Sequence, residues 1–153
     1  MSGRYDVDVT AMSTAPPADV WRLLADASTW SQWGAWHETK LDRDGSPDPN
    51  GVGALRRFHP FRFPRVSTVE EVVAFEPPQR LAYELRSGLP VRGYHADVTL
   101  EPVDGGTRIR WHSTYDGKFP GIGAVMRPIL TRTIRDTAKR LAAAAATPPL
   151  SSR

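Results

Sequence analysis

The chain has 153 residues, of which 40% are hydrophobic and 24% charged, and its net charge is +3 at pH 7. These values fit one globular domain and exclude a disordered chain. The chain contains no cysteine, which excludes disulfides, thiolate metal sites and cysteine nucleophiles. No apolar run approaches the ~20 residues of a membrane-spanning helix, and the N-terminus lacks the apolar core of a signal peptide. We therefore expect a cytoplasmic protein that is not integral to a membrane.

The predicted elements follow a simple order along the chain. Alternating apolar and polar residues predict a half-buried strand over residues 5–11. Two short helices are expected next, one over 15–26 with prolines at its start and one over 28–33 that opens with a capping serine. Strand-like runs separated by turns then continue to residue 116. Apolar residues at helical spacing from residue 122 to 141 predict one long amphipathic helix.

The last hairpin allows its register to be predicted. If Asp104 and Gly105 form a two-residue turn, Glu101 faces Arg108 on one side of the sheet, and Val98 faces Trp111 on the other. Charged residues then pair with charged ones and apolar residues with apolar ones, which supports this register. We expect the Trp111 face to pack under the long helix.

Several phrases of the sequence resemble a known family. The runs AFEPPQRLAYEL (74–85) and GGTRIRW (105–111), together with the order of elements, resemble the polyketide cyclase/dehydrase-type branch of the START/SRPBCC superfamily. The resemblance implies a single α+β helix-grip domain over residues 1–146, followed by a flexible tail over 147–153. In this fold a curved antiparallel sheet of about seven strands wraps a long C-terminal helix and encloses an apolar cavity. Members of the family bind or transform hydrophobic small molecules, and no universal catalytic motif carries over.

Four connections at one end of the predicted meander are rich in glycine, proline and bulky apolar residues, namely 33–36, 59–64, 87–91 and 116–123. Exposed apolar loops gathered at one end predict the mouth of a ligand cavity. Alternatively, these loops pack on one another and close the end of the sheet. Three of the five tryptophans lie within residues 30–36, and we expect Trp30 to pack in the core while Trp33 and Trp36 flank the mouth.

The predicted inner face carries aromatic rings and hydroxyl groups. Three tyrosines supply more hydroxyls than a dry core readily satisfies, so they suit a cavity that orients a polar atom of an apolar ligand. An ordinary aromatic core is the alternative. The predicted ligand-binding residues are Trp33, Trp36, Tyr83, Tyr94, Trp111, Ser113, Tyr115, Phe119, Ile122 and Met126.

Two residues are candidates for acid–base chemistry. Glu70 and Glu71 are adjacent on a predicted strand, so regular alternation sends one of them inward. If Phe75 faces inward, Glu71 does too, and Glu70 can pair with Arg86. A carboxylate in an apolar cavity has a raised pKa and can act as a general base, whereas a bulge in the strand or a partner such as Arg57 would remove this role. His59 lies at the predicted mouth and is the second candidate, although a solvated loop histidine is the alternative.

Other chemistries find little support in the sequence. The histidines lack metal-ligand spacing, so we expect no metal site and no cofactor. The run GIGAVM (121–126) lacks the third glycine of a dinucleotide fingerprint. The basic aromatic run RRFHPFRFPR (56–65) is isolated and broken by prolines, so we expect no nucleic-acid partner, and a hairpin tip that touches anionic ligands or a membrane is the alternative.

These observations favour a monomer or weak homodimer that binds an aromatic, polyketide-like or lipid-like molecule between its sheet and its C-terminal helix. If the protein is an enzyme, cyclisation or dehydration of a polyketide-like substrate suits such a site best. A non-catalytic carrier or sensor of lipid-like ligands is the alternative, because carriage requires only shape and hydroxyl groups. A co-chaperone-like interaction module is a third possibility, and a filled, dry interior would be its signature.

Overall fold

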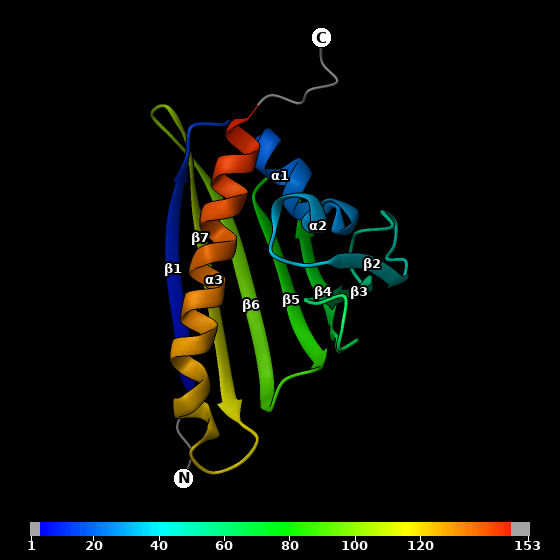
Figure 1. Cartoon of the computed structure of the whole chain (residues 1–153). Coiled ribbons are helices and arrows are strands. Elements are labelled where there is room, and N and C mark those ends of the chain that lie inside the picture. The colour runs from blue at the N-terminus through cyan, green and yellow to red at the C-terminus, as the bar shows by residue number, and fades with distance from the viewer. Residues whose placement is uncertain (1–3, 148–153) are drawn as a thin grey trace.

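The computed structural model describes residues 4–147, in which one antiparallel sheet curves around a long C-terminal helix (Figure 1). The seven strands are β1 (Tyr5–Ser13), β2 (Glu38–Arg43), β3 (Leu55–His59), β4 (Thr68–Glu76), β5 (Arg80–Ser87), β6 (Val91–Val103) and β7 (Gly106–Gly117). The helices are α1 (Pro17–Ala25), the 3₁₀ turn η1 (Ala27–Thr29), α2 (Trp30–Trp33) and α3 (Ile122–Ala146). The predicted helix-grip fold is confirmed. Residues 1–3 and the expected tail from residue 148 onward lie outside the described part.

The strand order is β1-β7-β6-β5-β4-β3-β2. Strands β2 to β7 form a meander in chain order, and the first strand pairs with the last. The predicted register of the β6–β7 hairpin is confirmed from His95 to Val103, with Glu101 opposite Arg108 and Val98 opposite Trp111. Beyond it, a shift between Arg92 and His95 displaces the pairing, so the register does not extend through the start of β6.

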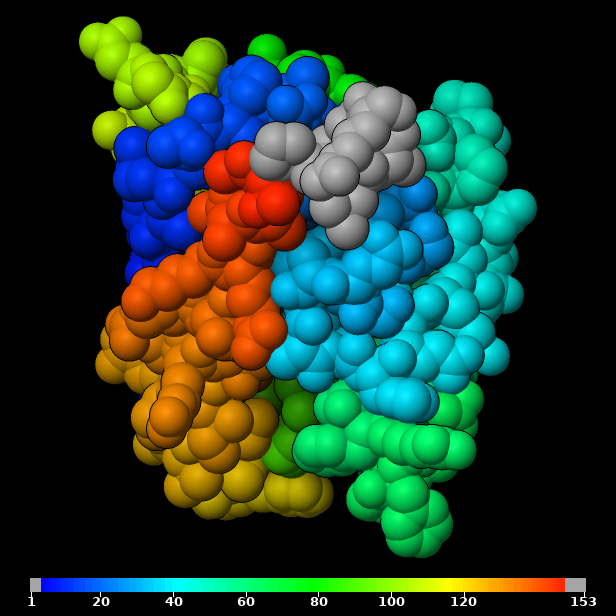
Figure 2. All heavy atoms as spheres, turned by 45° about the horizontal axis from the view of Figure 1, so that its top comes forward, coloured from blue at the N-terminus to red at the C-terminus, as the bar shows by residue number. Residues whose placement is uncertain are grey.

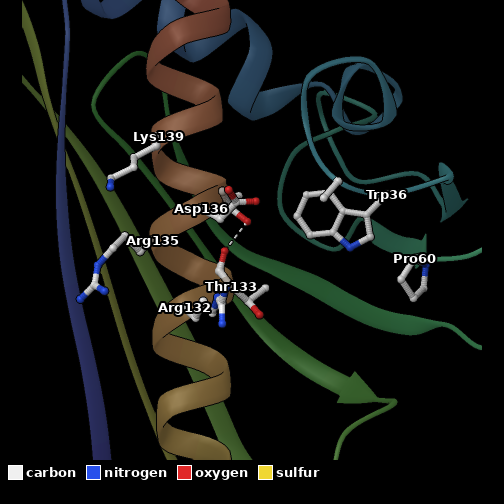
Figure 3. A pocket seen from close by; sticks show the side chains of 9 residues that line it. Trp36, Pro60, Arg132, Thr133, Arg135, Asp136 and Lys139 are labelled. Atoms are coloured by element: carbon white, nitrogen blue, oxygen red, sulfur yellow. Dashed lines mark hydrogen bonds between the residues drawn. The ribbon is translucent and has the colours of Figure 1, made fainter.

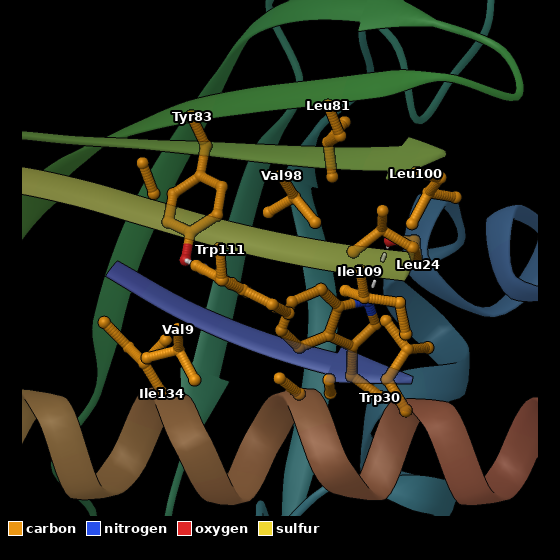
Figure 4. Packing of buried hydrophobic residues seen from close by; sticks show 14 of the residues in the cluster. Val9, Leu24, Trp30, Leu81, Tyr83, Val98, Leu100, Ile109, Trp111 and Ile134 are labelled. Atoms are coloured by element: carbon orange, nitrogen blue, oxygen red, sulfur yellow. Dashed lines mark hydrogen bonds between the residues drawn. The ribbon is translucent and has the colours of Figure 1, made fainter. Parts of the chain in front are cut away.

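The core lies between the concave face of the sheet and α3 (Figure 4). Trp30, Leu81, Val98 and Ile109 are each at most 1% exposed there. Alternation along the strands sends Leu81, Val98 and Ile109 to the concave face, and Trp30 reaches the same core from α2. The 3.6-residue repeat of α3 turns Leu130, Ile134, Ala138 and Leu141 toward them. Trp21 on α1 packs edge-on against Phe75 and closes the end of the core under the short helices.

Each end of α3 is joined to the sheet by a buried hydrogen bond. The Tyr115 hydroxyl donates to the Gly123 carbonyl at 2.8 Å, and Ser13 Oγ donates to the Ala142 carbonyl at 2.8 Å. At Gly123 the helix lies so close to β1 that a Cβ atom would stand 2.3 Å from the Tyr5 ring. Glycine at this position therefore permits the close approach of α3 to β1.

Candidate ligand-binding site

An inner cavity of about 220 Å³ lies between the concave sheet face and α3. Its wall is mainly aromatic and aliphatic, with one carboxylate and three threonines. The lining residues are Trp30, Trp36, Pro60, Thr68, Glu70, Tyr83, Leu85, Leu89, Tyr94, Trp111, Met126, Ile129, Leu130, Thr133, Ile134 and Thr137. An apolar concave pocket with a few converging polar groups is typical of a small-molecule site.

A second, more open pocket of about 560 Å³ adjoins the inner cavity. The two share Trp36, Pro60, Thr133 and Thr137, so these four residues surround the passage between them. The rest of the outer lining includes charged side chains of α3. Figure 3 shows Trp36 and Pro60 across from α3, whereas Arg135 and Lys139 extend from the opposite side of the helix. Figure 2 shows the opening as a hollow between α3 and the connection that follows β3.

A buried ion pair forms part of the cavity wall. Arg56 on β3 lies directly opposite Glu70 on β4, and Arg56 Nη2 donates to Glu70 Oε1 at 2.7 Å. The Arg56 side chain is fully buried and that of Glu70 is 13% exposed. Burial raises the pKa of the Glu70 carboxyl above its ordinary value, and the positive charge of Arg56 opposes this rise only in part. Glu70 thus combines a raised pKa with a position in the wall of an apolar cavity.

Aromatic rings surround the Arg56 guanidinium. Its Cζ atom lies 4.7 Å from the centroid of the Trp30 ring, 5.4 Å from that of Phe58 and 5.2 Å from that of Tyr83. Arg56 Nε and Nη1 have no hydrogen-bond partner within residues 4–147. The negative faces of the rings partly replace the missing acceptors, because a guanidinium is attracted to an aromatic π-face.

Glu70 rather than Glu71 faces the cavity, so the predicted orientation was wrong. The prediction assumed unbroken alternation back from Phe75. The pairing with β5 instead shifts between Val72 and Ala74, and this bulge changes which face the preceding residues occupy. Val72 is fully buried, whereas Glu71 accepts a hydrogen bond from Arg86 Nε at 3.0 Å on the outer surface. Arg86 therefore pairs with Glu71 instead of Glu70.

His59 does not line either cavity pocket, although the neighbouring Pro60 lines both. The histidine is buried, and its Nδ1 lies 3.0 Å from the Val66 carbonyl oxygen, to which it donates. This bond ties the end of β3 to the connection that follows it. The geometry supports a structural role for His59, so neither the predicted acid–base group at the mouth nor the alternative of a solvated loop histidine describes it.

The cavity wall includes two of the three predicted tyrosines. Trp111 Nε1 donates to the Tyr83 hydroxyl at 3.1 Å, and the Tyr94 hydroxyl lies 3.0 Å from Ser113 Oγ. Burial raises the pKa of both tyrosines, so both remain protonated and available as hydrogen-bond donors. Tyr115 and Ser113 are fully buried but do not line the cavity. Tyr115 instead holds the start of α3.

The other predicted ligand-binding residues divide between the cavity and the rest of the molecule. Trp36 and Met126 line the cavity as expected. Trp33 is 8% exposed and packs against Trp30 with ring centroids 4.9 Å apart, so it belongs to the core beneath the short helices. Phe119 and Ile122 lie outside the cavity wall, because the connection to α3 runs past the end of the sheet.

Several residues of the wall were not predicted from the sequence. Trp30, predicted as core alone, also lines the cavity, and so do Thr133 and Thr137 of α3. The threonines fall on the same stripe of the helical repeat as Met126, and this spacing is the signal that would have found them. Arg56 lies two residues from Phe58 and so shares its strand face, but arginine is rarely buried, and its residue type therefore argued against a place in the core.

Comparisons with known proteins agree with this geometry. The profile of the family described as polyketide cyclase/dehydrase and lipid transport matches residues 4–146. The chain belongs to this family. The polyketide cyclase/dehydrase and lipid transport family is of the START/SRPBCC type, as the resemblance implied. Among curated proteins, none matches the sequence. No helix within residues 4–147 is long and apolar enough to cross a membrane.

Solved structures show the same fold at low sequence identity. Ara h 8.0201 superposes with a TM-score of 0.74 at 13% identity, over 94% of this chain and 98% of that one. Norcoclaurine synthase from Thalictrum flavum gives 0.71 at 16% identity, over 94% and 87%. A protein from Nitrosospira multiformis gives 0.73 at 18% identity, over 97% and 100%. Together with the family match, these similarities identify a hydrophobic ligand-binding fold.

Proposed function

We propose that this protein binds a small aromatic, polyketide-like molecule in the inner cavity, with a polar group of the ligand directed toward Glu70. The observation that carries the proposal is a cavity lined by aromatic rings and aliphatic side chains around one carboxylate. Five aromatic residues supply stacking and edge contacts, and they bury apolar ligand surface. Glu70 and the protonated Tyr83 and Tyr94 fix the orientation of the ligand, since each lines the same space.

The position of Glu70 favours catalysis over simple carriage. For a substrate with a carbonyl group, the ionised carboxylate removes a proton from the adjacent carbon, and the bonding electrons move to the carbonyl oxygen as an enolate forms. Tyr83 accepts from Trp111, which leaves its own proton for the developing oxyanion. The protonated carboxyl then returns a proton when a ring closes or water leaves. The proposed reaction is therefore the cyclisation or dehydration of a polyketide-like substrate. We place the protein in the cytoplasm.

A carrier or sensor of lipid-like ligands is the second candidate, and the passage to the outer pocket supports it. Both pockets share Trp36 and Thr133, so a ligand longer than the inner cavity extends outward between α3 and Pro60. The interaction-module alternative required a filled interior, and the cavity of about 220 Å³ counts against it.

Calorimetric titration with 2-naphthol, an aromatic phenol, tests binding in the cavity. Thr133→Phe places a ring in the passage and should weaken binding about tenfold or more, as expected when an apolar group fills the space of the ligand. Thr131→Phe, on the same helix but outside both pockets, is the matched control and should bind as the wild type does. Equal affinities of the two variants would contradict a site in the inner cavity.

Native mass spectrometry of protein purified from its own host should then identify the natural ligand as a co-purifying molecule. With that compound or its precursor as substrate, Glu70→Gln should abolish turnover while 2-naphthol still binds. Glu71→Gln, on the outer surface, should leave turnover unchanged. Turnover that survives Glu70→Gln would rule out Glu70 as the proton-transfer group, whereas binding of the compound without turnover by the wild type would favour the carrier function.

A further inference from the structure

Large apolar side chains are exposed around the mouth of the cavity. Phe63 is 89% exposed and Phe61 is 55% exposed, and both belong to the β3–β4 connection. On the side of α3, Ile129 is 52% exposed, Val125 is 58% exposed, and Phe119 just before the helix is 59% exposed. Single exposed apolar residues are ordinary, but several large ones bordering one opening indicate an interaction surface.

These side chains stand on both sides of the same opening. Pro60, which precedes Phe61, and Ile129 of α3 both line the inner cavity. The backbone amide of Lys118 donates to the Pro90 carbonyl at 3.1 Å, so the connection that carries Phe119 adjoins the β5–β6 turn. Figure 2 shows the β3–β4 connection as a protrusion on one side of the hollow and α3 on the other. We call Phe61, Phe63, Phe119, Val125 and Ile129 the mouth surface.

Basic side chains accompany the mouth surface, and the neighbouring carboxylates are already paired. Arg62, Lys118 and Arg132 are exposed and form no ion pair within residues 4–147. Three carboxylates nearby are neutralised by other arginines, Glu38 by Arg65, Asp116 by Arg4 and Asp136 by Arg140. The surface therefore presents apolar tips with unbalanced positive charge between them.

We propose that the mouth surface docks on an anionic lipid bilayer, with Phe61 and Phe63 inserted among the lipids and the basic residues at the headgroups. Aromatic tips interleaved with arginines match the apolar interior and negative surface of such a bilayer. The apolar groups stand on two sides of a hollow rather than in one flat patch, which suits a deformable lipid layer better than the rigid face of a protein. This docking goes beyond the proposed ligand binding and does not depend on the identity of the ligand.

Vesicle flotation of the full chain tests the proposal. Binding should be strong to phosphatidylcholine vesicles that contain about 30% phosphatidylglycerol, weak to pure phosphatidylcholine, and lower at high salt. Phe61→Ser with Phe63→Ser should reduce partitioning about tenfold or more, and Arg62→Glu with Arg132→Glu by about tenfold. The control variants are Met12→Ser with Val52→Ser, which remove apolar side chains exposed elsewhere, and Arg22→Glu on α1; they should bind as the wild type does.

A second measurement does not rely on loss of binding. The chain has no cysteine, so Phe63→Cys provides a single site for an environment-sensitive fluorophore, with Met12→Cys as the matched control. Emission at position 63 should rise and shift to shorter wavelength with the anionic vesicles, while emission at position 12 should not. An unchanged signal at position 63, or equal changes at both positions, would overturn membrane docking and leave the mouth surface to a protein partner. Neither result bears on 2-naphthol binding in the cavity.

Discussion

Arg56 Nη2 lies 2.7 Å from Glu70 Oε1, at a depth where the Arg56 side chain has no exposure to solvent. The pair joins adjacent strands, β3 and β4, and only the carboxylate of the pair lines the inner cavity. Arg56 therefore holds the Glu70 carboxylate in position without itself lining the cavity. The rings of Trp30, Phe58 and Tyr83 enclose its guanidinium. Folding and the proposed chemistry both depend on this arrangement.

Removing one partner of the pair should destabilise the protein strongly. Glu70→Ala leaves a fully buried guanidinium without the one hydrogen-bonded partner that it has within residues 4–147, and we expect a loss of about 3–5 kcal/mol in the free energy of unfolding. Arg56→Met combined with Glu70→Leu replaces both charges with apolar groups and should lose less than Glu70→Ala alone. Urea unfolding measures both values. A double variant less stable than Glu70→Ala would show that the ion pair itself holds the strands together.

The same carboxyl should make stability depend on pH. The pKa of Glu70 in the folded state lies above its ordinary value of 4.5, so folding favours the protonated form. This contribution is fully present below pH 4.5 and is lost as the pH rises through the folded-state pKa. The free energy of unfolding of the wild type relative to Glu70→Gln should therefore fall as the pH rises above 4.5. Urea unfolding across this range is the measurement, and a difference that rises with pH would contradict the sign.

The hydroxyl of Tyr83 should contribute to stability through Trp111. Tyr83→Phe keeps the ring but leaves the buried indole Nε1–H without its acceptor, and we expect a cost of about 1–3 kcal/mol. The control is Tyr94→Phe with Ser113→Ala, which removes both members of a hydroxyl pair and leaves neither unsatisfied by the other. Thermal and urea unfolding should show a larger loss for Tyr83→Phe. Equal stability of Tyr83→Phe and the wild type would mean that another group accepts from Trp111.

Two tryptophans three residues apart should respond differently to truncation. Trp33→Ala removes a ring packed on Trp30 in the core and should cost about 3–5 kcal/mol, with no direct effect on ligand contacts. Trp36→Ala removes a side chain of the passage and should weaken 2-naphthol binding more than it lowers stability. Calorimetry and urea unfolding together distinguish them. If Trp33→Ala stays stable but loses binding, Trp33 belongs to the site after all.

The sequence predicted the elements that have long, regular patterns. The repeat of α3 and the paired charges of the β6–β7 hairpin each indicate one arrangement, because a one-residue slip would expose an entire apolar face. The bulge between Val72 and Ala74 cannot be recognised in the sequence. The residues around it are all apolar, so no alternation of apolar and polar residues shows which of them face the core. Because the sequence does not reveal the bulge, Glu71 was expected to face inward in place of Glu70.

The site was harder to predict than the fold, because it depends on how elements pack. Helical spacing correctly places Trp30 and Trp33 on neighbouring positions, but it does not say which of them meets the sheet. Composition likewise argues that Arg56 is exposed, and only the enclosing rings and the cross-strand carboxylate explain its burial. Contacts between elements far apart in the chain therefore determine the wall of the cavity.

The hydrogen bonds to the Gly123 and Ala142 carbonyls fix α3 to the sheet near both of its ends. A helix fixed in this way does not swing outward as a lid, so the space beneath it keeps its height. Widening of the passage then requires movement of the opposite wall, where Trp36 and Pro60 lie on short connections. The rate of ligand exchange should accordingly depend on how fast those connections move, while α3 remains fixed on the other side of the passage.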